Sequence, residues 1–305
     1  MKMYNFMALR WPAAVFSLVL LAISVGSLAT KELQWGLDFT GGTLVEVAYS
    51  DSADLTEIRS TIDSRGYSGA LVVSFGTDRD VLIRLPVGTS DEQGAALLGI
   101  LQSESSDTVE LRRIEFVGPQ VGEELREQGG LAMLLALGLV MVYIAFRFQF
   151  KFALGAVGAL AHDVIIVLGF FSIMGLEFDL TVLAAILAVI GYSLNDTIVV
   201  SDRIRENFRK LRRVESIEVI NQSLSETLGR TLVTSLTTLL VLISLALVGG
   251  EMINGFAIAL LVGVFVGTYS SIYVAANLLL TLGVSKDDLM MPLPDELEDE
   301  LALDP

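Results

Sequence analysis

Apolar residues occur in six blocks, each long enough to cross a bilayer. The first runs over residues 11–29 without a charged side chain, and about 20 helical residues span roughly 30 Å of hydrocarbon. The others cover residues 131–146, 152–174, 180–200, 231–248 and 256–282. We predict an α-helical integral membrane protein with spans at 11–30, 129–147, 152–174, 179–201, 231–248 and 256–282.

The first block also has features of a cleavable signal peptide. Lys2 and Arg10 precede it, and the sequence Ser27-Leu28-Ala29 resembles a cleavage site. The apolar run is longer than the roughly 7–15 residues that are usual in signal peptides. We therefore favour an uncleaved anchor over a cleaved leader.

Positive charges in the short connections predict the orientation, since basic residues remain preferentially on the cytoplasmic side. The connections at 175–179 and 249–255 carry no basic residue. The connections after the second and fourth spans, with the start of the fifth, carry Arg147, Lys151, Arg203, Arg205, Arg209, Lys210, Arg212, Arg213 and Arg230. We expect a cytoplasmic N-terminus (1–10), a cytoplasmic loop (202–230), a cytoplasmic acidic tail (283–305) and a periplasmic segment (31–128).

The periplasmic segment has the pattern of a soluble domain. Alternating apolar residues predict strands at 43–49, 70–75, 81–85 and 109–116, and helical spacing predicts helices at 53–65 and 91–102. We expect a turn at 76–79. The order βαββαβ is typical of a ferredoxin-like α+β sandwich. The segment shows no nucleophile with a base and no phosphate loop, so we expect a gripping or docking surface.

Composition excludes several classes of function. The net charge of −16 argues against nucleic-acid binding, which depends on clusters of Lys and Arg. The chain has no Cys and one His, so it has no disulfide, no thiolate metal site and no histidine-rich metal centre. We expect no cofactor and no enzymatic activity.

Charged residues inside the predicted spans are candidates for function, because a charge in hydrocarbon costs about 2.5–3.5 kcal/mol on insertion scales. Asp163 follows His162 in the third span, Asp196 follows Asn195 in the fourth, and Arg230 opens the fifth. Burial favours a protonated Asp and a nearby Arg favours a charged one, so such an Asp can load and release protons. The alternatives are a structural cap or an interhelical hydrogen bond for Asp196, purely structural roles within the bundle for Asp163 and His162, and a positive-inside anchor for Arg230.

Hydroxyl residues in the last two spans are a weaker signal. On the fifth span they share a helical face with Arg230, where they could carry water or bond across helices: Thr231, Thr234, Ser235 and Thr238. In the last span we expect only close helix packing from Gly263, Gly267, Thr268, Ser270 and Ser271.

Two glycine-rich segments flank the periplasmic domain. One interpretation is that their glycines only permit tight turns. The other is that they are hinges about which the domain tilts as a rigid body. The candidate residues are Gly36, Asp38, Gly41, Gly42, Gly118, Pro119 and Gly122.

Five segments resemble the SecF family of protein-export membrane proteins. They are WGLDFTGG at 35–42, RIEFVGPQVG at 113–122, ALAHDVI at 159–165, the long segment LTVLAAILAVIGYSLNDTIVVSDRIREN at 180–207, and TLGRTLVTSLTTLL at 227–240. The resemblance implies half of a twelve-span unit of the resistance-nodulation-division (RND) type, completed by SecD. It also implies that Asp196 carries protons, that Arg230 acts with it, and that Asp163 has a lesser role.

The resemblance further implies a place in the bacterial inner membrane and use of the proton gradient in late translocation. The implied partners are SecD, the SecYEG channel, the SecA ATPase, the exported unfolded polypeptide and the bilayer, with YajC and YidC as further candidates. One rival is an RND-type proton-coupled exporter of small molecules or lipids. Another is a passive scaffold. The acidic residues 295–304 match no motif, and we expect them to be disordered.

Overall fold

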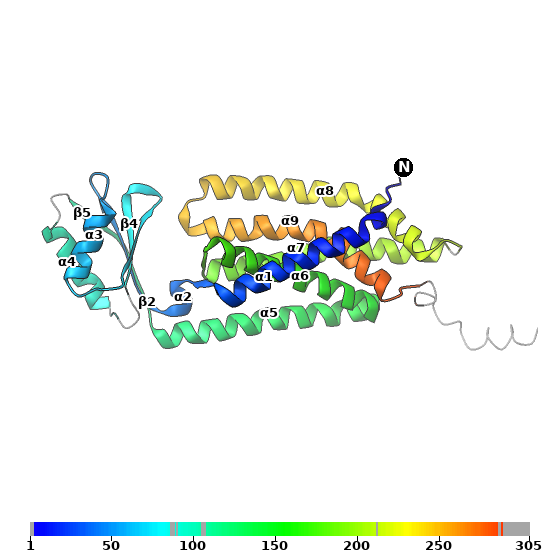
Figure 1. The fold of residues 1–305 in the computed structure, drawn as a ribbon, viewed down its shortest axis with the longest axis horizontal. Coiled ribbons are helices and arrows are strands. Elements are labelled where there is room, and N and C mark those ends of the chain that lie inside the picture. The colour runs from blue at the N-terminus through cyan, green and yellow to red at the C-terminus, as the bar shows by residue number, and fades with distance from the viewer. Residues whose placement is uncertain are drawn as a thin grey trace, which may run out of the picture.

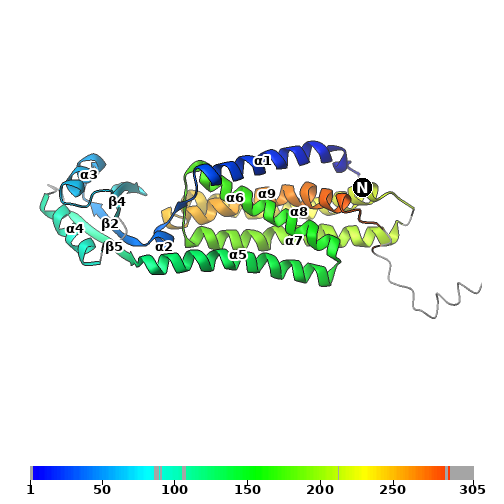
Figure 2. The same cartoon turned by 60° about the horizontal axis from the view of Figure 1, so that its bottom comes forward.

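The computed structural model describes residues 3–85, 89, 91–104, 108–211, 213–285 and 288. The protein is elongated, with a helical bundle at one end and a small α+β domain at the other (Figures 1 and 2). We call the two ends of the bundle the domain end and the distal end, and the N-terminus lies at the distal end (Figure 1). Arg212 and the acidic tail at 295–304 lie outside the described residues.

Six helices are long and apolar enough to cross a membrane, as predicted. About half of the apolar part of α6, α7 and α9 is buried (56%, 50% and 44%), against 11–17% for the other helices. The core of the bundle is therefore α6, α7 and α9. The bounds are α1 (Arg10–Thr30), α5 (Pro119–Arg147), α6 (Phe150–Met174), α7 (Leu180–Lys210), α8 (Ser216–Val248) and α9 (Glu251–Thr281).

Several helices extend beyond the predicted spans. Helix α5 begins at Pro119, whose fixed φ and missing N–H suit the first turn of a helix. Helix α7 continues to Lys210 and α8 begins at Ser216, so most of the segment predicted as a loop at 202–230 is helical. Hydropathy reports the length embedded in lipid, whereas a helix can continue as an amphipathic segment beyond it.

Close contact between helices depends on glycine. A Cβ on Gly263 of α9 would overlap the side chain of Val189 on α7, and one on Gly267 would lie 3.1 Å from Cβ of Ser193. A Cβ on Gly169 of α6 would likewise overlap Ser24 of α1. Small residues at these crossings let the helix backbones approach closely.

The small domain has the predicted ferredoxin-like topology. It contains β2 (Gly42–Tyr49), α3 (Leu55–Ser64), β3 (Leu71–Phe75), β4 (Thr77–Leu85), α4 (Asp91–Glu104) and β5 (Val109–Val117). The antiparallel sheet has the order β3-β4-β2-β5. Helices α3 and α4 contact each other over a core that includes Val45, Ile62 and Leu97. The turn expected at 76–79 is tighter: it centres on Gly76, at φ 76°, and β4 already begins at Thr77.

A compact joint connects the domain to the bundle. The short strand β1 (Gln34–Trp35) pairs in parallel with β6 (Glu177–Phe178), and the short helix α2 (Leu37–Thr40) follows. The first residue of β2, Gly42, lies opposite the last residue of β5, Val117, and the two strands are paired in antiparallel fashion. The chain therefore enters and leaves the domain through two neighbouring strands.

Candidate functional site

Asp196 lies in the interior of the bundle, on the side of α7 that faces α8. Its side chain is 3% exposed, and its Oδ2 has no hydrogen-bond partner among the described residues. The hydroxyl of Ser235 and the guanidinium of Arg230, both on α8, interact with this carboxyl. Asp196 is thus a buried carboxyl with one oxygen for which the described residues provide no hydrogen-bond partner.

Two further oxygens, on residues next in sequence to Asp196 and Arg230, are also unpaired among the described residues. Thr197, next to Asp196 on α7, and Thr231, next to Arg230 on α8, are each 1–2% exposed. Their Oγ1 atoms have no hydrogen-bond partner within the described part of the chain. Unpaired buried polar groups are costly and uncommon. Asp196 and Arg230 are thus each followed along their helix by a threonine whose hydroxyl has no partner among the described residues.

Arg230 acts on Asp196 without touching it. The residue is exposed at the surface of α8. No ion pair within 4.0 Å joins it to Asp196 in the described residues, although its charge acts on the carboxyl. The structure therefore brings these two predicted residues to neighbouring positions on facing helices, but does not make them a contact pair.

The predicted polar face of α8 divides into two pairs. Thr231 and Ser235 are buried, and Ser235 accepts a hydrogen bond from Thr268 of α9 at 2.7 Å. Thr234 donates to the carbonyl of Arg230 at 3.0 Å, and Thr238 accepts from the hydroxyl of Tyr192 at 3.2 Å. The first pair faces the interior around Asp196, whereas the second is only partly buried.

Asp163 is fully buried and is the centre of a separate cluster. Its Oδ2 accepts hydrogen bonds from the hydroxyls of Ser193 on α7 and Ser270 on α9, each at 2.7 Å. Its Oδ1 lies 2.9 Å from Nδ1 of His162. This carboxyl therefore joins the three central helices and has all the partners that Asp196 lacks.

The two aspartates lie on different helices, Asp163 on α6 and Asp196 on α7, and face different neighbours. Ser193, which bonds Asp163, precedes Asp196 by three residues, so both lie on one side of α7 within a single turn. No hydrogen bond joins the two carboxyls in the described residues. The polar groups instead run from Asp163 through Ser193 on one side, and from Asp196 through Ser235 to Thr268 on the other.

Our sequence interpretation missed Ser193, Ser270 and Thr268. We expected Ser270 and Thr268 to serve close packing only, yet they bond Asp163 and Ser235 respectively. Their predicted depth in the membrane could have identified them. Each is a hydroxyl residue in an apolar helix, at about the same depth as a buried carboxyl on a neighbouring helix.

Asn195 does not join the Asp196 site. It is exposed, while Asp196 beside it is buried. One residue turns an α-helix by about 100°, because 3.6 residues complete a turn. Asn195 therefore belongs to the outer surface of α7.

The two glycine-rich segments pack against each other. Gly41 has φ 70°, and a Cβ there would lie 2.8 Å from Cα of Pro119. A Cβ on Gly122 would lie 3.0 Å from the backbone of Phe39. Gly42 also has positive φ (126°), whereas Gly118 is in extended conformation and caps α5. These segments form one close-packed joint.

Other contacts attach this joint and the domain to the bundle. Oδ2 of Asp38 accepts a hydrogen bond from the backbone N–H of Leu180, at the start of α7, at 3.0 Å. Gly36 precedes α2, and a Cβ there would lie 3.0 Å from Cβ of Asp179. Arg84, in strand β4 of the domain, forms an ion pair with Glu177 in strand β6, next to the bundle. The domain thus rests on the bundle.

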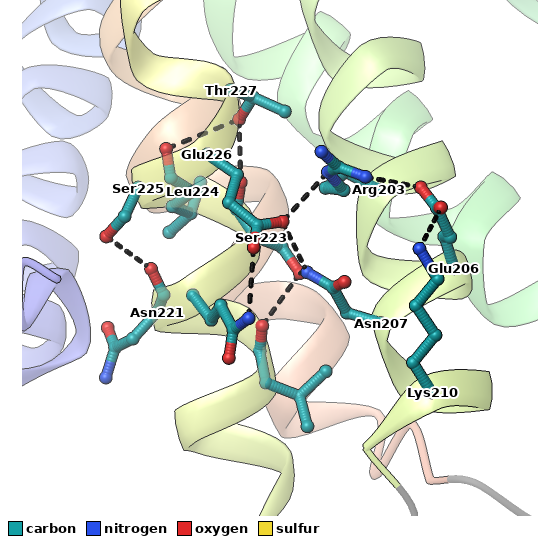
Figure 3. A network of polar contacts seen from close by, with 12 residues as sticks. Arg203, Glu206, Asn207, Lys210, Asn221, Ser223, Leu224, Ser225, Glu226 and Thr227 are labelled. Carbon is teal, nitrogen blue, oxygen red and sulfur yellow. Dashed lines mark hydrogen bonds and ion pairs between the residues drawn. The ribbon is translucent and has the colours of Figure 1, made fainter. Parts of the chain in front are cut away.

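A polar network that we did not predict joins α7 to α8 at the distal end (Figure 3). The amide of Asn207, which is 3% exposed, donates to Ser223 at 3.0 Å and to Glu226 at 2.9 Å. Arg203 pairs with Glu226 at 2.9 Å and with Glu206 at 2.6 Å. Residues that we had assigned to a positively charged loop therefore fix the two helices to each other.

Comparisons with known proteins agree with this architecture. The family described as "Protein export membrane protein SecD/SecF, C-terminal" matches residues 99–285, and the "SecD/SecF GG Motif" matches residues 26–53. The chain is 52% identical to protein translocase subunit SecF of Vibrio alginolyticus, covering 93% of this chain and 92% of that protein. It is 51% identical to the SecF subunit of Pseudomonas aeruginosa, covering 97% of each.

Solved structures of SecDF resemble both parts of the molecule. The crystal structure of SecDF from Thermus thermophilus, described as a translocon-associated membrane protein, matches with a TM-score of 0.84, 41% identity and 92% of this chain. SecDF in its super-membrane-facing form matches with a TM-score of 0.70, 38% identity and 99% of this chain. The chain spans about two fifths of each SecDF chain (39% and 40%). It belongs to the SecF family of protein translocase subunits.

Proposed function

We propose that the protein, with SecD, uses the proton gradient of the bacterial inner membrane to drive late steps of protein translocation, after SecA has acted. The observation that carries the proposal is the unpaired carboxyl oxygen of Asp196, buried beside Ser235 and within the influence of Arg230. A buried ionisable group inside a membrane bundle is expensive, and it typically marks a path for ions or protons.

Proton binding at Asp196 would change the forces between α7 and α8. Protonation removes the attraction of Arg230 for the carboxyl, and release of the proton restores it. One charge crossing 100 mV supplies about 2.3 kcal/mol, which shifts a two-state equilibrium roughly fifty-fold. The network of Asn207, Arg203 and Glu226 ties the distal ends of the two helices. A change in the charge of Asp196 would therefore move α7 and α8 relative to each other mainly between Asp196 and the domain end of the bundle.

The orientation follows from the charges at the distal end. Arg147 and Lys151 lie where α5 meets α6, and Arg209, Lys210 and Arg213 lie where α7 meets α8. By the preference of basic residues for the cytoplasm, this end is cytoplasmic and the ferredoxin-like domain is periplasmic. Both termini then lie in the cytoplasm.

The outer surface of α7 is our candidate contact with SecD. Its exposed positions are spaced three and four residues apart and are small or polar, as at helix interfaces in membranes. An exposed amide such as that of Asn195 is costly in contact with lipid, so we expect it to contact another protein chain. This chain matches about two fifths of the SecDF chain, and the unmatched three fifths are long enough to include such a partner. The stripe consists of Thr181, Ala184, Ala188, Gly191 and Asn195.

The domain and its joint supply the mechanical part of the proposal. We propose that the periplasmic domain holds the exported polypeptide and tilts on the joint, within a holoenzyme that includes SecYEG and SecA, with YajC and YidC as further partners. A cleft of about 430 Å³ separates the sheet from the bundle, between residues such as Leu82, Glu177 and Met252.

The test is Asp196→Asn, reconstituted with SecD, SecYEG and SecA in proton-loaded vesicles. The shape of the side chain is kept but it can no longer carry a proton, so we expect translocation to fall to the level seen after a protonophore collapses the gradient. Asp202→Asn on the exposed face of the same helix is the matched control. If Asp196→Asn inserts normally and retains gradient-dependent translocation, the proton-relay proposal is wrong.

A further inference from the structure

A cleft of about 470 Å³ lies at the distal end of the bundle, between the end of α5 and the last turns of α7. Its described lining consists of four basic and two acidic residues. The residues of α7 in this lining are three, four, seven and eight positions after the first of them, so they form a single face of the helix. The lining is Arg147 from α5 and Asp202, Arg205, Glu206, Arg209 and Lys210 from α7.

The two carboxylates do not balance the basic side chains of this cleft. Glu206 is already paired with Lys210 at 2.5 Å and with Arg203, which lies outside the cleft, at 2.6 Å. Asp202 lies 3.8 Å from the guanidinium of Arg147, so this ion pair is a loose one. No carboxylate of the described residues forms an ion pair with Arg209. The cleft therefore holds positive charge that its own carboxylates leave unneutralised.

Arg205 has a structural role that accounts for one of the basic residues. Its guanidinium donates to the carbonyl of Arg147 at 3.3 Å, at the end of α5, where backbone carbonyls lack helical partners. This bond also brings its charge near those of Arg147 and Arg209, and both act on it. Like charges repel, so three neighbouring guanidinium groups are stabilised when an anion binds among them.

The cleft lies where the apolar blocks of the sequence end. Arg147 directly follows the block at 131–146, and Asp202 comes two residues after the block at 180–200. Phe146 and Phe150, close to Arg147 in sequence, are 89% and 64% exposed, so the membrane surrounds them. The head groups of a bilayer lie just outside its hydrocarbon, at the depth of this cleft. This depth favours a lipid over a phosphate compound dissolved in water.

We propose that the cleft binds the head group of an anionic glycerophospholipid, whose phosphate contacts Arg147 and Arg209. A guanidinium can bind two phosphate oxygens at once. Basic pockets between helices at a membrane surface are typical sites for anionic head groups. A zwitterionic lipid carries a cation beside its phosphate, and the basic side chains repel that cation.

Such a lipid would connect α5 to α7. Only 11% of the apolar part of α5 is buried, so the protein itself holds this helix weakly. Helix α5 begins at Pro119, in the joint with the domain, and ends at Arg147. A head group bound by Arg147 and Arg209 would fix the distal end of α5 to the helix that carries Asp196. This role depends on charge and depth alone, whether or not the protein transfers protons.

The absence of cysteine allows one fluorophore to be placed close to the cleft. The full chain with Phe150→Cys is labelled and placed in phosphatidylcholine nanodiscs, with spin-labelled phosphatidylglycerol or spin-labelled phosphatidylcholine as the quencher. We expect phosphatidylglycerol to quench at a several-fold lower mole fraction and to saturate, because a single site fills. A label at Leu9, which is 55% exposed and precedes α1 on the other side of the bundle from α5 (Figure 2), should show no such preference.

Two substitutions that remove the same charge distinguish the cleft from the general attraction of a basic surface. Arg209→Gln should weaken the preference for phosphatidylglycerol about fivefold, the effect of one basic residue at an anionic membrane surface. Arg213→Gln, at the same end of the bundle but outside the described lining, should leave the preference unchanged. Both arginines are exposed, so we expect both variants to fold.

Four results would overturn the proposal. Three of them are equal quenching by the two lipids, equal loss of the preference in the two glutamine variants, and the same preference at the Leu9 label. The fourth distinguishes a lipid from a soluble anion. Millimolar inorganic phosphate, compared with chloride at the same ionic strength, should leave the preference intact. If phosphate abolishes it, the cleft binds free phosphate and the assignment to a lipid is wrong.

Discussion

At the scale of single residues, the two buried aspartates differ in the partners that the protein provides. Asp163 receives hydrogen bonds from Ser193 and Ser270 and contacts His162, whereas Oδ2 of Asp196 receives none from the described residues. A carboxyl with all its partners holds helices together. One with a free oxygen can exchange a proton without breaking such a cluster. We therefore propose that Asp163 contributes mainly to stability and that Asp196 is the group that transfers protons.

The first prediction tests this division. Asp163→Ala removes one carboxyl and leaves Ser193 and Nδ1 of His162 unpaired, each at a cost of about 1–3 kcal/mol, while Ser270 keeps its bond to the carbonyl of Gly267. We expect a loss of several kcal/mol, seen as a markedly lower unfolding temperature of the purified protein in detergent. Asp196→Ala, a matched truncation at a similarly buried site, should change the unfolding temperature much less. Equal losses from both substitutions would contradict the assignment.

Sequence reasoning identified the charged residues but not their partners. Asp163, Asp196 and Arg230 stand out because a charge inside an apolar block is costly. Ser193, Ser270 and Thr268 do not, since small hydroxyl residues also serve ordinary packing in membranes. Asn195 was grouped with Asp196 because the two are adjacent in sequence, yet the helical turn of about 100° per residue places it on the outer surface.

At the scale of helices, the contact between α7 and α9 leaves no room for one extra methyl group. Val189 occupies the space that a side chain on Gly263 would need, and Ser193 lies against Gly267. The same contact brings Ser193 and Ser270 to Asp163. Packing of these helices and the geometry of the Asp163 cluster therefore depend on each other.

The second prediction follows from this contact. Gly263→Ala should destabilise the bundle by about 1–3 kcal/mol, the usual cost of overpacking, measured by thermal unfolding. Gly191→Ala on α7 is the matched control, because no atom lies within 4 Å of its added Cβ. It should leave stability unchanged or raise it slightly. Val189→Ala combined with Gly263→Ala should recover part of the loss, and no recovery would show that the overlap is not the cause.

Hydropathy predicted the number of helices correctly, but not where they end. Hydropathy identifies only the apolar part of a helix, whereas α5, α7 and α8 extend beyond the apolar blocks of the sequence. What stabilises the extension of α7 and α8 is a set of contacts between them, such as Asn207 with Glu226. Contacts between segments far apart in sequence cannot be inferred from periodicity along one segment. The order of elements in the small domain, by contrast, follows from local pattern alone.

At the scale of the whole molecule, the domain is held by the joint and by side chains that reach from its sheet to the bundle. The joint consists of backbone packed on backbone at Gly41, Pro119 and Gly122. The ion pair of Arg84 and Glu177 is partly exposed, so it contributes only about 0–1 kcal/mol. We propose that a contact as weak as this ion pair permits the domain to move away from the bundle and return.

The last prediction tests whether that movement is needed. The chain contains no cysteine, so Arg84→Cys and Glu177→Cys can be introduced without other changes and joined by a short, reducible, thiol-specific crosslinker. We expect the linked protein to lose gradient-dependent translocation and to recover it fully on reduction, because the link holds the sheet against β6. Each single cysteine treated with the same reagent is the control, and should retain activity since the ion pair itself is weak. Normal translocation by the linked protein would mean that the domain works in one fixed position, with the proton-driven change confined to α7 and α8.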